Sequence, residues 1–250
     1  MHMGDIIDGH WDPEIPLDKR LELSMRDLEV TAGLFDRLHA DRVFVVGNHC
    51  LQVPRERLME RLGMESCRQS RALCPGWRMV VLDSTALSHP LMEPFRTHDT
   101  EATGGEWREW WDANEGAPNR APYNSGIGRE QLAWLRAELA RAEQARERVL
   151  VAIHHPVAPG QSRGGHRAWD GDEVAAALLG SPAFALLLCG HDHLGGYRLE
   201  GGRHFVTLEG ALEAPEGGEC CGVLELYPDR AVLTGRGTMQ SREMALDPWL

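Results

Sequence analysis

Four short motifs carry side chains that could bind metal ions and phosphate. Their donors are carboxylate, amide and imidazole groups without a thiolate, a set that suits Mn²⁺, Fe²⁺ or Zn²⁺ at a catalytic site better than a structural zinc site. A single histidine is more often a hydrogen-bonded structural residue than a ligand, but four such motifs in order predict a metal centre. The motifs are Gly4-Asp5, Gly47-Asn48-His49, His154-His155-Pro156 and Gly190-His191-Asp192-His193.

The last three motifs each follow a segment that reads as a β-strand. Short apolar runs at 42–46, 149–153 and 185–188 lead almost directly into GNH, HHP and GHDH. In open α/β sheets, ligands bind at the carboxyl ends of the strands. We therefore expect these motifs to converge on one site although they are distant in sequence.

The other elements predict an α/β sandwich in one domain spanning 1–250. A further apolar run at 78–82 suits a strand covered on both faces, whereas later runs alternate and predict an antiparallel C-terminal third. These later runs lie at 204–208, 222–227 and 231–234. Helical periodicity is found at 17–38, 55–62, 128–147 and 172–179.

Residues 84–125 do not fit this alternation and predict a long inserted loop region. The segment is rich in Gly, Pro, Asn and acidic residues, yet it carries Trp107, Trp110 and Trp111. Two interpretations stay open. Either the tryptophans pin a surface excursion to the core, or they form a lid that offers a stacking face to a ligand.

Composition narrows the classes of partner. Among 250 residues, 38 acidic side chains outnumber 26 basic ones, and the formal net charge of −12 argues against nucleic acid as the main partner. No apolar run reaches the length of a membrane span, and the start lacks the pattern of a secretory signal, so we expect a cytoplasmic protein without a membrane partner. The six cysteines form no CxxC pair and are expected to be free thiols.

The ordered motifs resemble the signature of the calcineurin-like metallophosphoesterases, in which D-x-H or a variant precedes GD, GNH, H-x-P and GHxH. Within that superfamily the chain looks most like the manganese-dependent ADP-ribose/CDP-alcohol diphosphatases. This finer likeness rests on GDIIDGH, SGIGREQLAWL, GHDHLGGY and TLEGALEAP. The resemblance covers nearly the whole chain, and it implies a four-layer αββα sandwich of two mixed sheets.

The resemblance also implies a site for two divalent metal ions, with Mn²⁺ favoured over Fe²⁺ or Zn²⁺. Asp5 would bridge the two ions. Asn48, His154 and His191 would complete one coordination site, and His193 would bind the second ion.

Two further histidines of the motifs are expected to have other roles. By resemblance, His49 would face the substrate phosphate, where it could stabilise negative charge or protonate the leaving oxygen. The H-x-P spacing selects His154 as the ligand, so His155 is expected to be a supporting neighbour behind the ligands.

Asp8-Gly9-His10 imitates the D-x-H motif that opens the family signature. In the family that motif lies well upstream of GD, so here it would precede Met1. We therefore expect Asp8 to support the turn through hydrogen bonds. We also expect the chain to be an N-terminally shortened form, from a misassigned start or a genuine truncation. It would lack the first strand and one acidic ligand, it could hold only one ion, and its activity is open.

The predicted function is hydrolysis of the pyrophosphate bond in small nucleoside diphosphate derivatives such as ADP-ribose and CDP-alcohols. Two neighbouring cations lower the pKa of a shared water, so metal-bound hydroxide is the expected nucleophile. Neither a GxSxG elbow nor a phosphate loop of the GxxxxGK[ST] type occurs, which argues against a serine hydrolase or a kinase.

Three residues are candidates for substrate binding. Arg163 and His166 lie in the loop after HHP and could reach a second phosphate, although a solvated loop is an equally simple interpretation. Tyr197 follows GHDHLGG and could flank a base or ribose, or belong to a turn that enters the next strand.

Two alternative functions stay open. A cyclic-nucleotide or glycerophosphodiester phosphodiesterase would share every metal ligand. A non-catalytic nucleotide-binding metalloprotein would keep one metal site without turnover.

Overall fold

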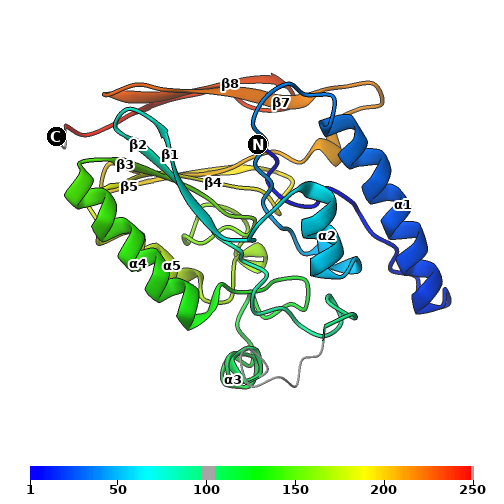
Figure 1. Cartoon of the computed structure of the whole chain (residues 1–250). Coiled ribbons are helices and arrows are strands. Elements are labelled where there is room, and N and C mark those ends of the chain that lie inside the picture. The colour runs from blue at the N-terminus through cyan, green and yellow to red at the C-terminus, as the bar shows by residue number, and fades with distance from the viewer. Residues whose placement is uncertain (97–104, 249–250) are drawn as a thin grey trace.

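Two β-sheets and the helices around them form the protein (Figure 1), whose computed structural model describes residues 1–96 and 105–248. The larger sheet has the strand order β1-β2-β3-β4-β6-β5, and the smaller sheet has the order β7-β8-β9. Strands β2, β3, β4 and β6 run parallel, whereas β1 and β5 are antiparallel edge strands. The smaller sheet is antiparallel, as the alternating C-terminal runs predict.

The strands and helices have the following bounds. The larger sheet contains β1 (Gln69–Cys74), β2 (Trp77–Val81), β3 (Arg148–Ala152), β4 (Phe184–Cys189), β5 (Gly196–Glu200) and β6 (Arg203–Thr207). The smaller sheet contains β7 (Cys220–Leu226), β8 (Arg230–Gly237) and β9 (Arg242–Ala245). The α-helices are α1 (Leu17–Phe35), α2 (Arg55–Leu62), α3 (Glu106–Ala113), α4 (Gly128–Ala145) and α5 (Gly171–Leu179). Short 3₁₀ turns are η1 (His49–Gln52), η2 (Gly164–His166) and η3 (Ala211–Glu213).

The central strands of the larger sheet are buried on both faces, which explains their continuous apolar sequences. Successive side chains of a strand point to opposite faces. In β3, Val149 and Val151 belong to the core shared with α4 and α5, whereas Leu150 faces the smaller sheet. Figure 1 shows the resulting layers, with α4 and α5 below the larger sheet and the smaller sheet above it.

The N-terminal helices pack on a separate core that includes the segment before GNH. Leu28 of α1 and Leu58 of α2 are fully buried there, together with Phe44 and Val46. The predicted strand at 42–46 is wrong as a regular element, because only Phe44 forms an isolated parallel bridge, with His2.

The reason for this short pairing lies in the partner segment. Two backbone hydrogen bonds join the segments, from His2 N–H to the Val43 carbonyl (2.8 Å) and from Val45 N–H to the His2 carbonyl (3.0 Å). Gly4 and Asp5 then adopt positive φ angles of 104° and 52°. The chain therefore leaves the extended conformation before a strand ladder can grow.

The excursion at 84–125 contains helix α3, which the composition did not predict. Trp107 of this helix is buried against Leu87 and Trp169, and Trp110 stacks on Trp169 with ring centroids 5.2 Å apart. These contacts are those that the pinning interpretation requires. Residues 97–104 of the predicted loop lie outside the described residues.

The other differences from prediction concern three edge strands and the end of one helix. Strands β1, β5 and β9 were not predicted, and the first helix ends at Phe35 rather than at residue 38. Within residues 1–96 and 105–248, no helix is long and apolar enough to cross a membrane.

A buried guanidinium ties α2 to the chain that follows β2. Arg55 donates to Asp83 over 2.8 Å and to the carbonyl of Thr85 over 2.6 Å, and it also binds Glu93. The Asp83 and Glu93 side chains are 10% and 4% exposed. Since carboxylates are costly to bury without a partner, this network fixes residues 83–93 beside the helix.

We expect Arg55→Met to lower the free energy of unfolding by about 3 kcal/mol, because the buried Asp83 and Glu93 carboxylates lose a guanidinium partner, although Arg96 still pairs with Glu93. Arg61 on the same helix pairs with the more exposed Glu29 and Asp36, so Arg61→Met should cost less than about 1 kcal/mol. Urea denaturation of both variants measures the difference. Equal losses in the two variants would show that the Arg55 network is not a stabilising anchor.

Candidate metal centre

The carboxyl ends of the parallel strands bring the chemical motifs together. His154 and His155 follow β3, and His191 follows β4. Asp5 and Asn48 come from the N-terminal segments beside this edge, and they contact the histidines directly. The expected convergence is thus found for GNH, HHP and the first histidine of GHDH, although GNH follows no regular strand. Asp5 of the GD motif joins them.

Asp5 is held from two sides. One carboxylate oxygen accepts the backbone N–H of His49 (2.8 Å), and the other lies 3.1 Å from Nε2 of His154. Burial pushes the pKa of Asp5 up, but attraction to His154 and His49 outweighs it and holds the pKa well below its ordinary value. The carboxylate is therefore ionised at neutral pH.

Asn48 lies between the two histidines from β3 and β4. Its Oδ1 atom is 3.1 Å from Nε2 of His154 and 3.0 Å from Nδ1 of His191, and the residue is fully buried. The opposite ring nitrogen of His154, Nδ1, donates to the Met3 carbonyl over 2.8 Å. This bond directs Nε2 of His154 toward Asp5 and Asn48.

The backbone is strained at two of these residues. Asp5 (φ 52°) and His191 (φ 65°) are non-glycine residues with left-handed conformations, which cost energy and tend to occur at functional sites. The neighbouring glycines leave room for this arrangement. A Cβ atom on Gly47 would lie 2.1 Å from Oδ1 of Asp5, and one on Gly4 would lie 2.1 Å from Nδ1 of His154.

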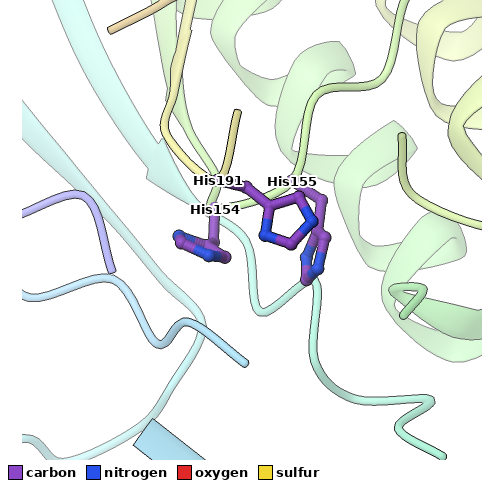
Figure 2. A group of neighbouring side chains, drawn as sticks. All are labelled: His154, His155 and His191. Carbon is purple, nitrogen blue, oxygen red and sulfur yellow. The ribbon is translucent and has the colours of Figure 1, made fainter. Parts of the chain in front are cut away.

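His155 joins the cluster but has both ring nitrogens occupied. Figure 2 shows the rings of His154, His155 and His191 next to one another, and one nitrogen from each lies within 4.8 Å of the others. Nδ1 of His155 accepts from the Ser84 hydroxyl (2.8 Å), and Nε2 donates to the Tyr123 carbonyl (3.2 Å). Burial and the neighbouring His154 lower the pKa of His155 to about 3. The ring is thus neutral and suits a supporting role.

His193 lies apart from this group. Its Nδ1 atom is 3.1 Å from a carboxylate oxygen of Glu213 in η3. His193 and Asp5 line the same cavity of about 680 Å³, together with His154 and His191. The assignment of His193 to a second metal ion stays a prediction.

His49 is anchored by Asp8, the acidic residue of the stretch that imitates the D-x-H motif. Its Nδ1 atom lies 2.6 Å from the Asp8 carbonyl and 3.0 Å from the Asp8 carboxylate. The ring of Trp11 packs edge-on against it, with centroids 5.3 Å apart. His10 turns to Asp27 on α1 instead, at 2.8 Å. Asp8 thus contacts a predicted catalytic residue, and His10 does not join the cluster.

The three predicted substrate residues have different surroundings. His166 is brought to the site, since its ring lies 5.6 Å from that of His191. Arg163 binds Asp192 of GHDH through Nε (2.9 Å) and a terminal nitrogen (2.6 Å). Tyr197 donates its hydroxyl toward His204 (2.8 Å) and is not brought to the histidine cluster. All three roles stay predictions.

Several contacts of the site come from residues that the motifs do not include. Ser84 and Tyr123 hold His155, Asn124 contacts His191, and Glu213 contacts His193. The strings YNSGIG and LEGALEAP contain three of them, but nothing in their spacing indicates a histidine partner. Ser84 follows a predicted strand, which is the one signal that could have found it.

The donor set fits a divalent cation. Three pairs of ligand atoms lie about 3 Å apart: the Asp5 carboxylate with Nε2 of His154, and Oδ1 of Asn48 with Nε2 of His154 and with Nδ1 of His191. Nδ2 of Asn48 is buried and has no hydrogen-bond partner among the residues that the structure describes. Burial, together with His155 and His154, lowers the pKa of His191 well below its ordinary value, so its ring is neutral and able to act as a ligand. Such groups suit Mn²⁺, Fe²⁺ or Zn²⁺.

Comparison with known proteins identifies the class. Residues 1–195 match the family model described as calcineurin-like phosphoesterase. The chain belongs to the calcineurin-like phosphoesterase family and is a metallophosphoesterase. This confirms the resemblance on which the ligand assignments rest, as well as the α/β sandwich fold.

The relatives are more specific. The chain is 33% identical to the manganese-dependent ADP-ribose/CDP-alcohol diphosphatase of Oryza sativa subsp. japonica, over 99% of this chain and 79% of that protein. It is 31% identical to the protein of the same name from Arabidopsis thaliana, over 97% and 80%. A crystal structure of a dimetal phosphatase from Danio rerio is similar, with a TM-score of 0.79 and 28% identity over 98% of this chain and 82% of that one.

We expect Gly47→Ala to weaken Mn²⁺ binding by about tenfold or more, because the new methyl group would displace the Asp5 carboxylate. Isothermal titration of the metal-free protein with MnCl₂ measures the dissociation constant. Gly164→Ala is the matched control, since a Cβ there meets nothing within 4 Å. Unchanged affinity in Gly47→Ala would contradict the placement of Asp5 in the metal site.

Proposed function

We propose that this chain is a manganese-dependent hydrolase of the pyrophosphate bond in small nucleoside diphosphate derivatives such as ADP-ribose and CDP-alcohols. The observation that carries the proposal is the contact of Asp5, Asn48, His154 and His191 at one sheet edge. Near full-length similarity to proteins named for this activity supports the substrate class.

In this proposal Asp5, Asn48, His154 and His191 would hold one divalent ion, and Asp5 and His193 would hold a second. Divalent ions bound there supply Lewis acidity, a reactive water at neutral pH and neutralisation of phosphate charge. The chain contributes a rigid set of ligands. Its glycines and backbone hydrogen bonds keep Asp5 and His154 in fixed orientations.

His49 is the proposed catalytic residue. Its Nδ1–H bond to the Asp8 carbonyl leaves Nε2 for the substrate, and the Asp8 carboxylate lies 3.0 Å from the same Nδ1 atom. The backbone N–H of the same residue binds Asp5, which places the ring beside the metal ligands. From there His49 can stabilise charge on a phosphate oxygen or donate a proton to the leaving group.

His166, Arg163 and Tyr197 are the proposed substrate contacts. His166 and Tyr123 lie side by side with ring centroids 5.7 Å apart, and each flanks His191. Aromatic rings beside a phosphate site suit the base or ribose of a nucleotide. Arg163 presents a partly exposed guanidinium that could also reach a second phosphate.

A small nucleotide is the proposed partner rather than nucleic acid, since the net charge is −12. All six cysteines are free, which suits the reducing cytoplasm that we propose as the compartment.

We expect the chain with Mn²⁺ to release AMP from ADP-ribose and CMP from CDP-choline. Chromatographic assays of these substrates beside 2′,3′-cAMP, glycerophosphocholine and an aryl phosphodiester test the proposal. Preferential hydrolysis of any of these three phosphodiesters would favour the phosphodiesterase alternative. Nucleotide binding without turnover of any of them would indicate a non-catalytic metalloprotein.

We expect His49→Gln to lower kcat by about 10²- to 10⁴-fold, because glutamine cannot transfer a proton. Its Mn²⁺ affinity should remain that of the wild type, since His49 is not a proposed ligand. His10→Gln is the control, because His10 lies near the same loop but pairs with Asp27. Loss of metal binding together with activity in His49→Gln would contradict the separation of roles.

A further inference from the structure

Asn124 contacts the metal-site histidine that follows β4. Its Oδ1 atom lies 2.9 Å from Nε2 of His191, and the residue is fully buried. Its amide nitrogen donates to the carbonyls of Asn119 (2.9 Å) and Gly165 (2.8 Å). One side chain thus connects the end of the long excursion, the loop after HHP and His191.

These bonds determine where the proton of His191 sits. Both amide hydrogens of Asn124 are used by carbonyl oxygens, which can only accept, so the amide cannot turn over. Oδ1 of Asn124 is therefore the atom that faces His191, and Nε2 of His191 must carry the hydrogen. Nδ1 keeps its lone pair and points at Oδ1 of Asn48, 3.0 Å away.

Other neighbours of His191 do not distinguish its two nitrogens. The rings of His155, His166 and Tyr123 lie 4.2, 5.6 and 5.9 Å from it. Ring contacts of this kind limit the plane of the imidazole, but they act equally on a ring turned by 180°. The hydrogen bond to Asn124 selects one of the two orientations.

The same arrangement is made for His154 in another way. There the Met3 carbonyl accepts from Nδ1 and leaves Nε2 for the site. The position of a backbone carbonyl is set by the fold and is not removed by a substitution, whereas an asparagine side chain can be replaced. A hydrogen-bond acceptor behind a metal-binding imidazole fixes its tautomer and raises its basicity.

We propose that Asn124 is a positioning residue, which orients His191 and places its lone pair for a divalent cation. The inference rests on the proposed function, because it takes His191 as a metal ligand. It also gives the excursion at 84–125 a role at the site, because Asn124 lies at the end of that segment and contacts His191.

Two substitutions separate positioning from simple fastening of the loops. Asn124→Ala removes the acceptor and both donors, and we expect its Mn²⁺ dissociation constant to rise by about 10- to 100-fold. Asn124→Asp keeps an acceptor for Nε2–H but loses the donors to Asn119 and Gly165. We expect Asn124→Asp to unfold at lower temperature while its Mn²⁺ affinity stays near that of the wild type.

Asn119→Ala is the matched control within the same loop. It removes one bond, from the Asn119 amide to the Ala168 carbonyl, and retains the backbone carbonyl that Asn124 uses. Its Mn²⁺ affinity should be unchanged. Wild-type affinity in Asn124→Ala, or equal loss in Asn124→Ala and Asn124→Asp, would overturn the proposal in favour of loop fastening.

A measurement on the wild-type chain covers the case in which these variants do not fold. Long-range ¹H–¹⁵N NMR spectra of the metal-free protein report which nitrogen of His191 carries hydrogen. We expect a slowly exchanging Nε2–H signal, and hydrogen on Nδ1 would overturn the proposal.

Metal affinity and the NMR signal do not depend on the substrate. If Asn124→Ala weakens Mn²⁺ binding but the wild-type protein hydrolyses no diphosphate, the proposed function fails and the role of Asn124 stands. If the diphosphates are hydrolysed and Asn124→Ala binds Mn²⁺ normally, the proposed function stands and the role of Asn124 fails.

Discussion

The crowding of electron-pair donors around Asn48 is the constraint on which the rest of the site depends. Its amide oxygen lies 3.1 Å or less from one nitrogen of each of two histidines, and one of these nitrogens also meets the Asp5 carboxylate. Donors of this kind repel one another unless a proton or a cation lies between them. The protein accepts left-handed backbone at Asp5 and His191 and removes side chains at Gly4 and Gly47 to hold them there.

The sheet architecture makes this crowding possible. Parallel strands β3 and β4 end at the same edge, so two histidines arrive without long connections. Burial on both faces makes the sheet rigid, with α4 and α5 on one side and the smaller sheet on the other. The Arg55 network adds a fixed point next to β2, from which Ser84 reaches His155.

Sequence predicted the parts that depend on one contiguous pattern. Apolar runs located β2, β3, β4 and β6, and the polar residues just after β3 and β4 were predicted to converge on one site because of that position. Their individual roles as ligands came from the family resemblance. The segment 42–46 is equally apolar, but it is buried without a strand ladder. Phe44 and Val46 pack in the core of α1 and α2, whereas Val43 and Val45 pack against β2 and β3. Strand β1 has three exposed residues and contains no apolar run from which a strand could be predicted. Asn124 and Glu213 were missed because their partners lie 67 and 20 residues away.

Strand β6 belongs to the larger sheet but lies after the residues that match the family model. Residues 1–195 match the family model and include all the proposed metal ligands. Yet β6, at Arg203–Thr207, pairs with β4 inside the larger sheet, and β8 and β9 cover the face of that sheet that Leu186 and Leu188 present. The stretch that holds the proposed ligands is therefore shorter than the stretch that forms the sheets behind them. Residues after 195 thus supply none of the proposed ligands, yet they complete the sheet from whose edge the histidines of β3 and β4 project.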